Sequence, residues 1–238
     1  MVQTIDLIQR SLRPPDRAAP AGAAERLIEA AGPLFAARGF DGVSTREVTR
    51  AAGVNLSAIT YHFDGKEGLY RAVLGRIVAD LRPARQAMLA DLGRGIAAAQ
   101  GDKAGLAQTT LRFVRQLIHA AALPAAPVWR LQLLLHEVGQ PSESFGLILD
   151  QHIGPVHDAV AALVGAARGE SPASPRVCLL AQSVLTLCLQ FRFQQSIIQA
   201  RLGWSSYGAD ELHVMVRTIG AAVLAMLALP PPAEETPP

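Results

Sequence analysis

The sequence is poor in the residues that build metal centres and disulfide frameworks. Only two of its 238 residues are cysteines, Cys178 and Cys188, and its Cys, His and carboxylate residues form no cluster that suits a metal. Both cysteines fall on one predicted helix, about 15 Å apart at 1.5 Å of rise per residue, which is too far for a disulfide within it. We expect two buried apolar groups and no metal or other cofactor. A redox switch is the alternative interpretation.

The sequence also lacks the local signatures of the common enzyme classes. It contains no GxSxG elbow, no P-loop, no GxGxxG and no HExxH motif. His152 and His157 lie on either side of Pro155, a spacing that does not place two metal ligands on one helical face. We therefore predict that the protein is not an enzyme, and we assign no catalytic or metal-binding residue.

Long apolar runs and a strong net charge are absent as well. No apolar run approaches the roughly 20 residues that span a bilayer, and no basic segment followed by an apolar core opens the chain. These absences predict a soluble, cytoplasmic protein with no membrane partner. The net charge of +2 is too small to indicate nucleic acid by itself, so the local placement of charge matters more. With 238 residues the chain is long enough for two modules.

The most informative stretch is Ser44–Lys66, STREVTRAAGVNLSAITYHFDGK. Ser44 and Glu47 have the spacing of a capping box, which predicts the start of a helix. Gly53 supplies the backbone freedom that a sharp turn needs, and Asn55 is expected to cap a second short helix. Two helices joined by such a turn form a helix-turn-helix, whose second helix can lie in the major groove of DNA.

The residue order in this stretch points to a known family. The run GVNLSAITYHF, followed by the polar pair Lys66 and Glu67, resembles the recognition helix of TetR-family transcriptional repressors. The resemblance extends upstream through residues 34–40 and covers about residues 23–81. It implies an N-terminal three-helix helix-turn-helix head that binds DNA, followed by a larger C-terminal helical domain for ligand binding and dimerisation.

The resemblance also implies which residues contact DNA. Arg46 is placed to offer its planar fork to guanine O6 and N7, Leu56 to contact a thymine methyl, and Ser57 to reach a base edge. The other matched positions usually hold phosphates, which fix register without reading sequence: Thr45, Thr60, Tyr61, His62 and Lys66. Structural alternatives remain open, because Thr45 can simply support the helix cap, and Leu56 or Tyr61 can pack against the head.

The rest of the chain is expected to be helical, which makes the fold class all-α. A helix from Lys66 should carry an apolar stripe, and Gly and Pro residues then separate further helices at 84–99, 104–122, 127–139, 142–168 with a break near Gly154–Pro155, 174–202 and 209–229. The predicted domains are a flexible arm at 1–22, the DNA-binding domain at 23–82, the effector-binding and dimerisation domain at 83–230, and a disordered tail at 231–238. The arginines of the arm are expected to be solvated, with phosphate contact as the alternative.

The C-terminal part resembles one TetR subgroup, the CecR-like (YbiH-like) regulators. The resemblance rests on these residues: Arg130, His136-Glu137, Pro141, Phe145, His152 to Pro155, Gln190 to Phe193, and Arg201 to Trp204. It implies a small-molecule effector site, and a mostly apolar pocket with a few polar groups is the expected chemistry. The candidate lining residues are Phe113, Trp129, Arg130, Leu133, His136, Phe145 and Phe191, each of which has a core or solvated role as its alternative.

Two predicted helices, 174–202 and 209–229, are apolar on more than one face, which requires burial of more than one face. TetR-family dimers pair two such helices from each subunit, so the resemblance predicts a homodimer through them; a monomer interior is the alternative. The predicted function is a ligand-responsive repressor that binds a palindromic operator as a dimer and is released by a small-molecule effector. Activation of transcription in place of repression stays open, and a helical protein-interaction scaffold without specific DNA binding is the alternative hypothesis.

Overall fold

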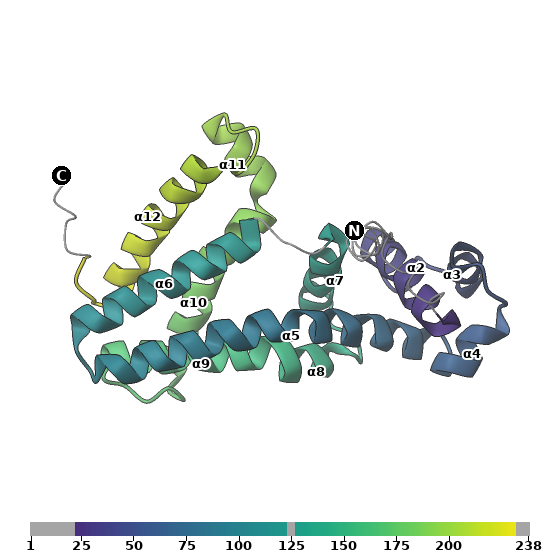
Figure 1. Cartoon of the computed structure of the whole chain (residues 1–238), viewed down its shortest axis with the longest axis horizontal. Helices are drawn as coiled ribbons and strands as arrows, with labels where there is room; N and C mark the ends of the chain where they lie inside the picture. The colour runs from purple at the N-terminus through teal and green to yellow at the C-terminus, as the bar shows by residue number, and fades with distance from the viewer. Residues whose placement is uncertain (1–21, 123–126, 232–238) are drawn as a thin grey trace, which may run out of the picture. The chain divides into compact units, whose positions relative to one another are not determined.

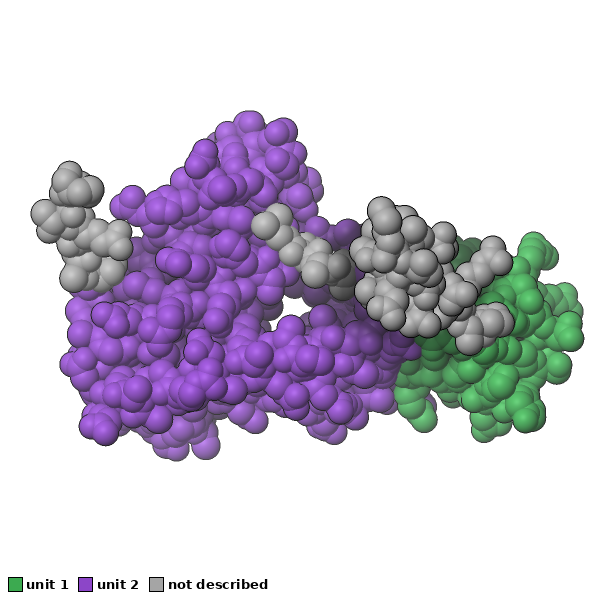
Figure 2. Space-filling model, viewed as in Figure 1, with its two compact units in different colours: residues 1–73 green, residues 74–238 purple. Residues whose placement is uncertain are grey.

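The computed structural model describes residues 22–122 and 127–231. These residues form helices and no strand, which confirms the all-α fold class. The chain divides into two compact units, unit 1 (residues 1–73) and unit 2 (residues 74–238), coloured separately in Figure 2. Both this division and the sequence-predicted boundary after residue 82 fall inside one helix, α5 (Lys66–Ala99). Apart from Gly22 and Pro231, the predicted arm and tail lie outside the described residues.

Unit 1 contains α2 (Ala23–Arg38), α3 (Thr45–Ala52), α4 (Ser57–Phe63) and the first eight residues of α5 (Figure 1). Its core holds an aromatic cluster. The ring of Tyr70 lies edge-on to Phe35 and to Phe40, with centroids 5.0 Å and 5.2 Å away. Leu27 and Ile59 are also buried in this unit. Burial of these large side chains lets three short helices form a stable head.

The start of α3 and the turn between α3 and α4 form largely as their residues dictate. The predicted capping box is confirmed, because the Ser44 hydroxyl accepts from the Glu47 N–H while the Glu47 carboxylate accepts from the Ser44 N–H. Gly53 ends α3 in the left-handed region at φ 64°, which glycine adopts without strain. The prediction that Asn55 caps α4 is wrong. Leu56 occupies that position with helical dihedrals, and no side chain caps the helix.

Helix α5 runs through Pro83, which contradicts the predicted separate segment 84–99. Proline removes one helical hydrogen bond, the one to the carbonyl of Ala79. Ala79 and Pro83 are both exposed, so water can hydrogen-bond the carbonyl that proline leaves free. A proline on the solvated side of a long helix is therefore tolerated here.

Unit 2 is built around a core to which five helices contribute: α5 through Leu92 and Ala99, α6 (Lys103–Ala122), α9 (Gly154–Arg168), α10 (Pro175–Phe193) and α12 (Ala209–Met226) (Figure 1). Its other elements are α7 (Val128–Gly139), α8 (Phe145–Ile148), the π-helical turn η1 (Leu149–Ile153) and α11 (Gln195–Leu202). The predicted segment 174–202 is thus two helices, which meet at Gln194.

The interruption predicted near Gly154–Pro155 is the turn η1. Pro155 has no N–H to donate to the Gln151 carbonyl, so an α-helix cannot continue there without losing a bond. The chain instead widens by one residue, and the Gly154 N–H donates to the Leu149 carbonyl.

Helix α10 is, among the described residues, long and apolar enough to cross a membrane by length and composition. Much of its apolar surface faces the protein interior, because Val177, Ala181, Val184 and Cys188 are fully buried. The helix shares its core cluster with α6, α9 and α12. We therefore describe it as a core helix of unit 2.

Candidate functional site

Helix α4 presents one buried and one exposed face. Ile59 is 2% exposed and anchors the helix to the head. Ser57, Thr60 and Tyr61 lie on the opposite face and are exposed, and the Tyr61 side chain is 84% exposed. The face is short and polar, and residues 22–73 leave it exposed, so it has the shape and chemistry to enter a major groove.

Leu56, the residue before α4, is also exposed, at 48%. A large apolar side chain left in solvent beside polar neighbours suits contact with a thymine methyl. The structure therefore does not bury Leu56 or Tyr61 against the head, which was the structural alternative for both. The Tyr61 ring lies edge-on to the adjacent His62 ring at 4.8 Å, and His62 is exposed as well.

Helix α3 adds two arginines to the same unit. Arg46 and Arg50 are one helical turn apart and exposed, and within the described part of the chain neither side chain has a hydrogen-bond or ion-pair partner. Unpaired guanidinium groups are available for phosphate or guanine. Thr45 is half-buried at the first turn of α3, where its carbonyl accepts from the Thr49 hydroxyl.

Lys66 begins α5 and is held by the head. Its Nζ lies 4.3 Å from the centre of the Phe40 ring, and the residue is half-buried. A cation–π contact of this kind contributes about 0.5–1 kcal/mol and limits the reach of a flexible side chain. The contact with Phe40 therefore fixes the position of the ammonium group within unit 1.

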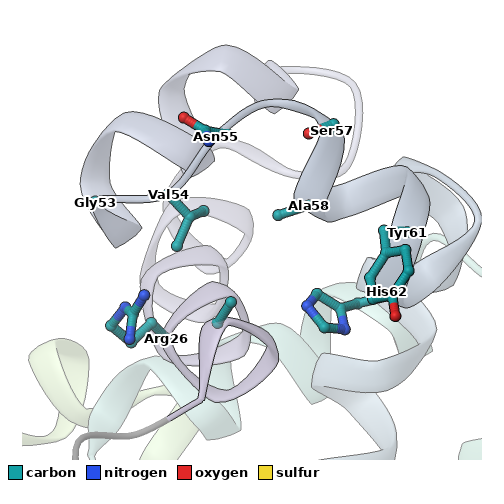
Figure 3. Close-up of a pocket in the computed structure, with 9 residues that line it drawn as sticks. Arg26, Gly53, Val54, Asn55, Ser57, Ala58, Tyr61 and His62 are labelled. Carbon is teal, nitrogen blue, oxygen red and sulfur yellow. The ribbon is translucent and has the colours of Figure 1, made fainter.

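A shallow concavity of about 510 Å³ lies beside this face, between the start of α2 and α4 (Figure 3). Figure 3 shows Arg26 on α2 below Val54, with Tyr61 and His62 across the hollow on α4. Arg26 donates from Nε to the Ala52 carbonyl at 3.2 Å, so part of its hydrogen-bonding capacity serves the end of α3.

Three residues of this surface have no individual DNA contact assigned to them from the sequence. Arg50 carried a signal, because it follows Arg46 by one helical turn. Asn55 is exposed on the turn and lines the concavity, whereas sequence reasoning gave it a capping role. Arg26 lies far from the motif in sequence, so no local spacing points to it.

The seven candidate pocket residues in unit 2 fall into two groups. Phe113 and Phe191 are buried in the core cluster. The other five lie on α7 and α8, namely Trp129, Arg130, Leu133, His136 and Phe145. Leu133 is buried, while the remaining four are half-buried. None of the seven lines the described cavity of unit 2, which is formed by α6 and the start of α12.

Arg130 connects α7 to α5. Its Nη1 donates to Asp80 Oδ2 at 2.7 Å, its guanidinium lies 5.6 Å from the centre of the Trp129 ring, and its Nε is buried without a partner. An unsatisfied buried donor costs on the order of 1–3 kcal/mol unless water or a ligand meets it. Nη1 of Arg130 is thus engaged by Asp80, whereas its Nε–H remains available to another polar group.

A second polar contact joins α5 to η1. Arg85 donates from Nη1 to Nδ1 of His152 at 2.9 Å, so that imidazole nitrogen accepts and the ring is neutral. Burial, aided by the Arg85 charge, lowers the pKa of His152 to about 4. Burial also lowers the pKa of Arg85, and the neighbouring charge of Arg82 acts in the same direction.

Two family models match the chain. Residues 27–73 match the model for bacterial regulatory proteins of the tetR family. Residues 106–228 match the model for the C-terminal domain of the HTH-type transcriptional dual regulator CecR. The chain is also similar to the CecR regulator of Shigella flexneri, with 27% identity over 197 residues that cover 83% of this chain and 87% of that protein.

Solved structures share the fold. A transcriptional regulator from Rhodococcus sp. Rha1 superposes with a TM-score of 0.57 and 21% identity, over 87% of this chain and 99% of that one. AibR, whose crystal structure is a complex with isovaleryl coenzyme A and operator DNA, superposes with a TM-score of 0.53 and 15% identity, over 84% of this chain and 97% of that one. At these identities the likeness establishes the fold alone.

Proposed function

The chain belongs to the TetR family of bacterial transcriptional regulators, in its CecR-like branch, and we propose that it is a ligand-responsive repressor that binds a palindromic operator as a homodimer. DNA binding falls to residues 23–82, and effector binding and dimerisation fall to residues 83–230. The relatives are transcriptional regulators, and the proposed function includes no catalysis. Because operator DNA is the partner, the protein acts in the cytoplasm.

The observation that carries the proposal is the pairing of a free polar face on α4 with two unpaired arginines on α3. Arg46, Leu56 and Ser57 are assigned to bases. Thr45, Thr60, Tyr61, His62 and Lys66 are assigned to phosphates. The exposure of Tyr61 and Leu56 supports this division, since neither side chain is used by the fold of the head. The remaining support is the match of residues 27–73 to the tetR family.

The homodimer is proposed to form through α10 and α12. Each helix leaves a row of uncharged residues in solvent: Leu179, Gln182, Ser183, Thr186 and Phe193 on α10, and Val214, Thr218, Ala221, Ala222 and Ala225 on α12. The α10 row begins with Leu179, which is 70% exposed, and ends with Phe193, which is 50% exposed, so it leaves large apolar side chains in solvent. A second copy that covers these rows would bury them, and two identical subunits would present two heads to a palindrome.

The effector is proposed to be a small molecule that binds unit 2 and releases the operator. A related fold, AibR, was crystallised with both isovaleryl coenzyme A and operator DNA, which supports a bound small molecule in this architecture. A ligand can shift the DNA-binding equilibrium only by its different affinity for the two conformations of the dimer.

Selection of genomic fragments by the purified full-length protein tests the proposal. The protein should enrich fragments that share a palindrome with half-sites about one helical turn or more apart. Enrichment that follows only fragment length, with no shared sequence, would favour the scaffold hypothesis.

A further inference from the structure

Unit 2 contains a cavity of about 510 Å³ between α6 and the start of α12. Four basic side chains line it, and they come in two pairs. Arg115 and His119 lie one helical turn apart on α6, and His213 and Arg217 lie one turn apart on α12. Since residues four apart share a helical face, each helix directs both members of its pair to the same cavity.

These four side chains are exposed, and within the described residues none of them has a hydrogen-bond or ion-pair partner. Some arginines elsewhere in the chain are paired with carboxylates, as Arg38 is with Glu47 and Arg130 is with Asp80. No carboxylate lines this cavity. Two acids, Asp210 and Glu211, lie between the lining residues Ala209 and Leu212 in sequence, and neither lines the cavity. The Glu211 carboxylate accepts from the Gly208 N–H at the start of α12, at 2.9 Å.

The inner wall of the cavity is apolar. Leu212 and Tyr207 are buried there, and Val216 is half-buried beside them. The Tyr207 hydroxyl donates to the Phe191 carbonyl at 3.0 Å, so it is already engaged. An apolar wall with basic groups at the rim matches a ligand that has one apolar and one anionic end.

We propose that this cavity is the effector site and that its ligand is a small amphipathic anion, a carboxylate or a phosphate monoester on a short hydrocarbon chain. The volume falls within the roughly 300–1,000 Å³ of small-molecule sites. Two arginines stay charged at neutral pH and bind carboxylate or phosphate in a bidentate manner. The binding claim stands on the cavity alone, whereas the effector role rests on the proposed function.

The site is placed to influence the proposed dimer. His213 and Arg217 are each followed in sequence by a residue of the exposed α12 row, Val214 and Thr218. A ligand that draws α6 and α12 together acts on the same helix that carries this row. In the effector role that we propose, the ligand binds one arrangement of the dimer more tightly than the other, as release of the operator requires.

Four probes with one eight-carbon chain test the binding claim on the full-length protein: octanoate, octyl phosphate, octanol and octylamine. Isothermal titration calorimetry should show binding of one or both anions, at least tenfold tighter than the alcohol and the amine. The ratio of the two anions distinguishes a carboxylate from a phosphate ligand. Equal affinity for the neutral alcohol, or no heat from either anion, would overturn the proposal.

Matched variants locate the binding. Arg115→Gln with Arg217→Gln removes two charges from exposed positions and should weaken anion binding at least tenfold. Arg201→Gln removes the same charge from an exposed position on α11 that does not line the cavity, and it should bind as the wild type does. Unchanged anion affinity in the double variant would place the ligand elsewhere and refute the site.

A local fluorescence signal keeps the test independent of calorimetry. The Trp204 ring lies edge-on to the Tyr207 ring, 6.3 Å away, while the other tryptophan, Trp129, lies on α7. In a Trp129→Phe background, the bound anion should change the emission of Trp204. Binding heat without any change in this emission would count against the α6–α12 cavity.

The effector role is tested with the operator. Operator affinity is measured first without ligand, and its absence would count against the proposed function while the binding results stand. With operator binding established, the tighter anion should release the wild type, and the double variant should need at least tenfold more of it. Saturation with the anion and no loss of operator affinity would overturn the effector role.

Discussion

Arg38 at the end of α2 donates to Glu47 on α3, with 2.8 Å between Nη1 and Oε1. The same carboxylate accepts from the N–H of Ser44 at 2.9 Å, so one side chain joins the first helix of the head to the capping box of the second. The hydrogen bonds from Ser44 and Arg38 lower the pKa of Glu47 from 4.5 to about 2. The Arg38 and Glu47 side chains are both exposed, so their ion pair contributes little to the stability of the fold. The capping box and the negative charge of the Glu47 carboxylate within it contribute more.

This relationship predicts a pH dependence of stability. A carboxylate with a lowered folded-state pKa stabilises the fold fully above pH 4.5, and this contribution is lost as pH falls toward about 2. Glu47→Gln keeps the capping geometry but not the charge. Chemical denaturation should therefore find the variant less stable than the wild type at pH 6, with a smaller gap at pH 3. A gap that widens at pH 3 would contradict this account.

The control for that comparison is Glu143→Gln. Glu143 is an exposed carboxylate of unit 2 that makes no hydrogen bond within the described residues. Its replacement should change stability by less than about 0.5 kcal/mol at either pH.

Arg46 and Lys66 should differ in what they contribute to DNA binding. Arg46→Ala should cost about 1–3 kcal/mol on the operator and relax the preference at one base pair. Lys66→Ala should weaken binding to all sequences and reduce the salt slope by about 1. Fluorescence anisotropy with operator and random duplexes measures both effects, and Arg94→Ala, an exposed position in unit 2, is the control. If both variants lost equal affinity for operator and random DNA, the distinction between Arg46 as a base contact and Lys66 as a phosphate contact would be contradicted.

A charge placed in the exposed row of α12 should break the proposed dimer. Ala222→Glu would bury an unpaired carboxylate between subunits and should raise the dimer dissociation constant at least about 100-fold. Ala166→Glu makes the same change at an exposed position of α9 and should leave a dimer. Analytical ultracentrifugation over a concentration series measures both. A dimeric Ala222→Glu protein would place the interface elsewhere.

The two cysteines should react at very different rates. Cys188 is fully buried and burial raises its pKa to about 12, whereas Cys178 is half-buried. Because the thiolate is the reactive form, a native protein should alkylate at Cys178 first and at Cys188 only after denaturation. Mass spectrometry after a timed iodoacetamide pulse resolves the two sites. Rapid native labelling of Cys188 would revive the redox-switch interpretation.

Local chemistry made much of the head predictable. The capping box of Ser44 and Glu47 and the left-handed Gly53 are decided by neighbours in sequence, and both form as expected. The cap predicted at Asn55 does not form, because Leu56 already has helical dihedrals where the chain enters α4 and leaves no position for a side-chain cap. The helix break predicted at Pro83 does not occur, because the energetic cost of a proline inside a helix depends on whether water reaches the carbonyl that it leaves free. That exposure is a property of the tertiary structure, and sequence spacing does not reveal it.

The close contacts and the cavity depend on tertiary structure in the same way. A Cβ at Gly68 would collide with the Phe63 carbonyl oxygen, so glycine is required in the first turn of α5, where the chain passes the end of α4. No turn motif in the sequence marks this position. The basic cavity of unit 2 joins His119 to His213, which are far apart in sequence. Each has one basic neighbour a turn away on its own helix, Arg115 or Arg217, and only the contact of α6 with α12 brings the two pairs into one site.

The central claim is specific binding of operator DNA, and one titration tests it most directly. Full-length protein is titrated by anisotropy against the intergenic DNA upstream of its own gene, at about 50 and 200 mM salt, with random DNA as competitor. The account predicts binding that survives the competitor and weakens steeply with salt, because phosphate contacts release counterions. Binding that random DNA displaces equally well, or that does not respond to salt, would contradict it.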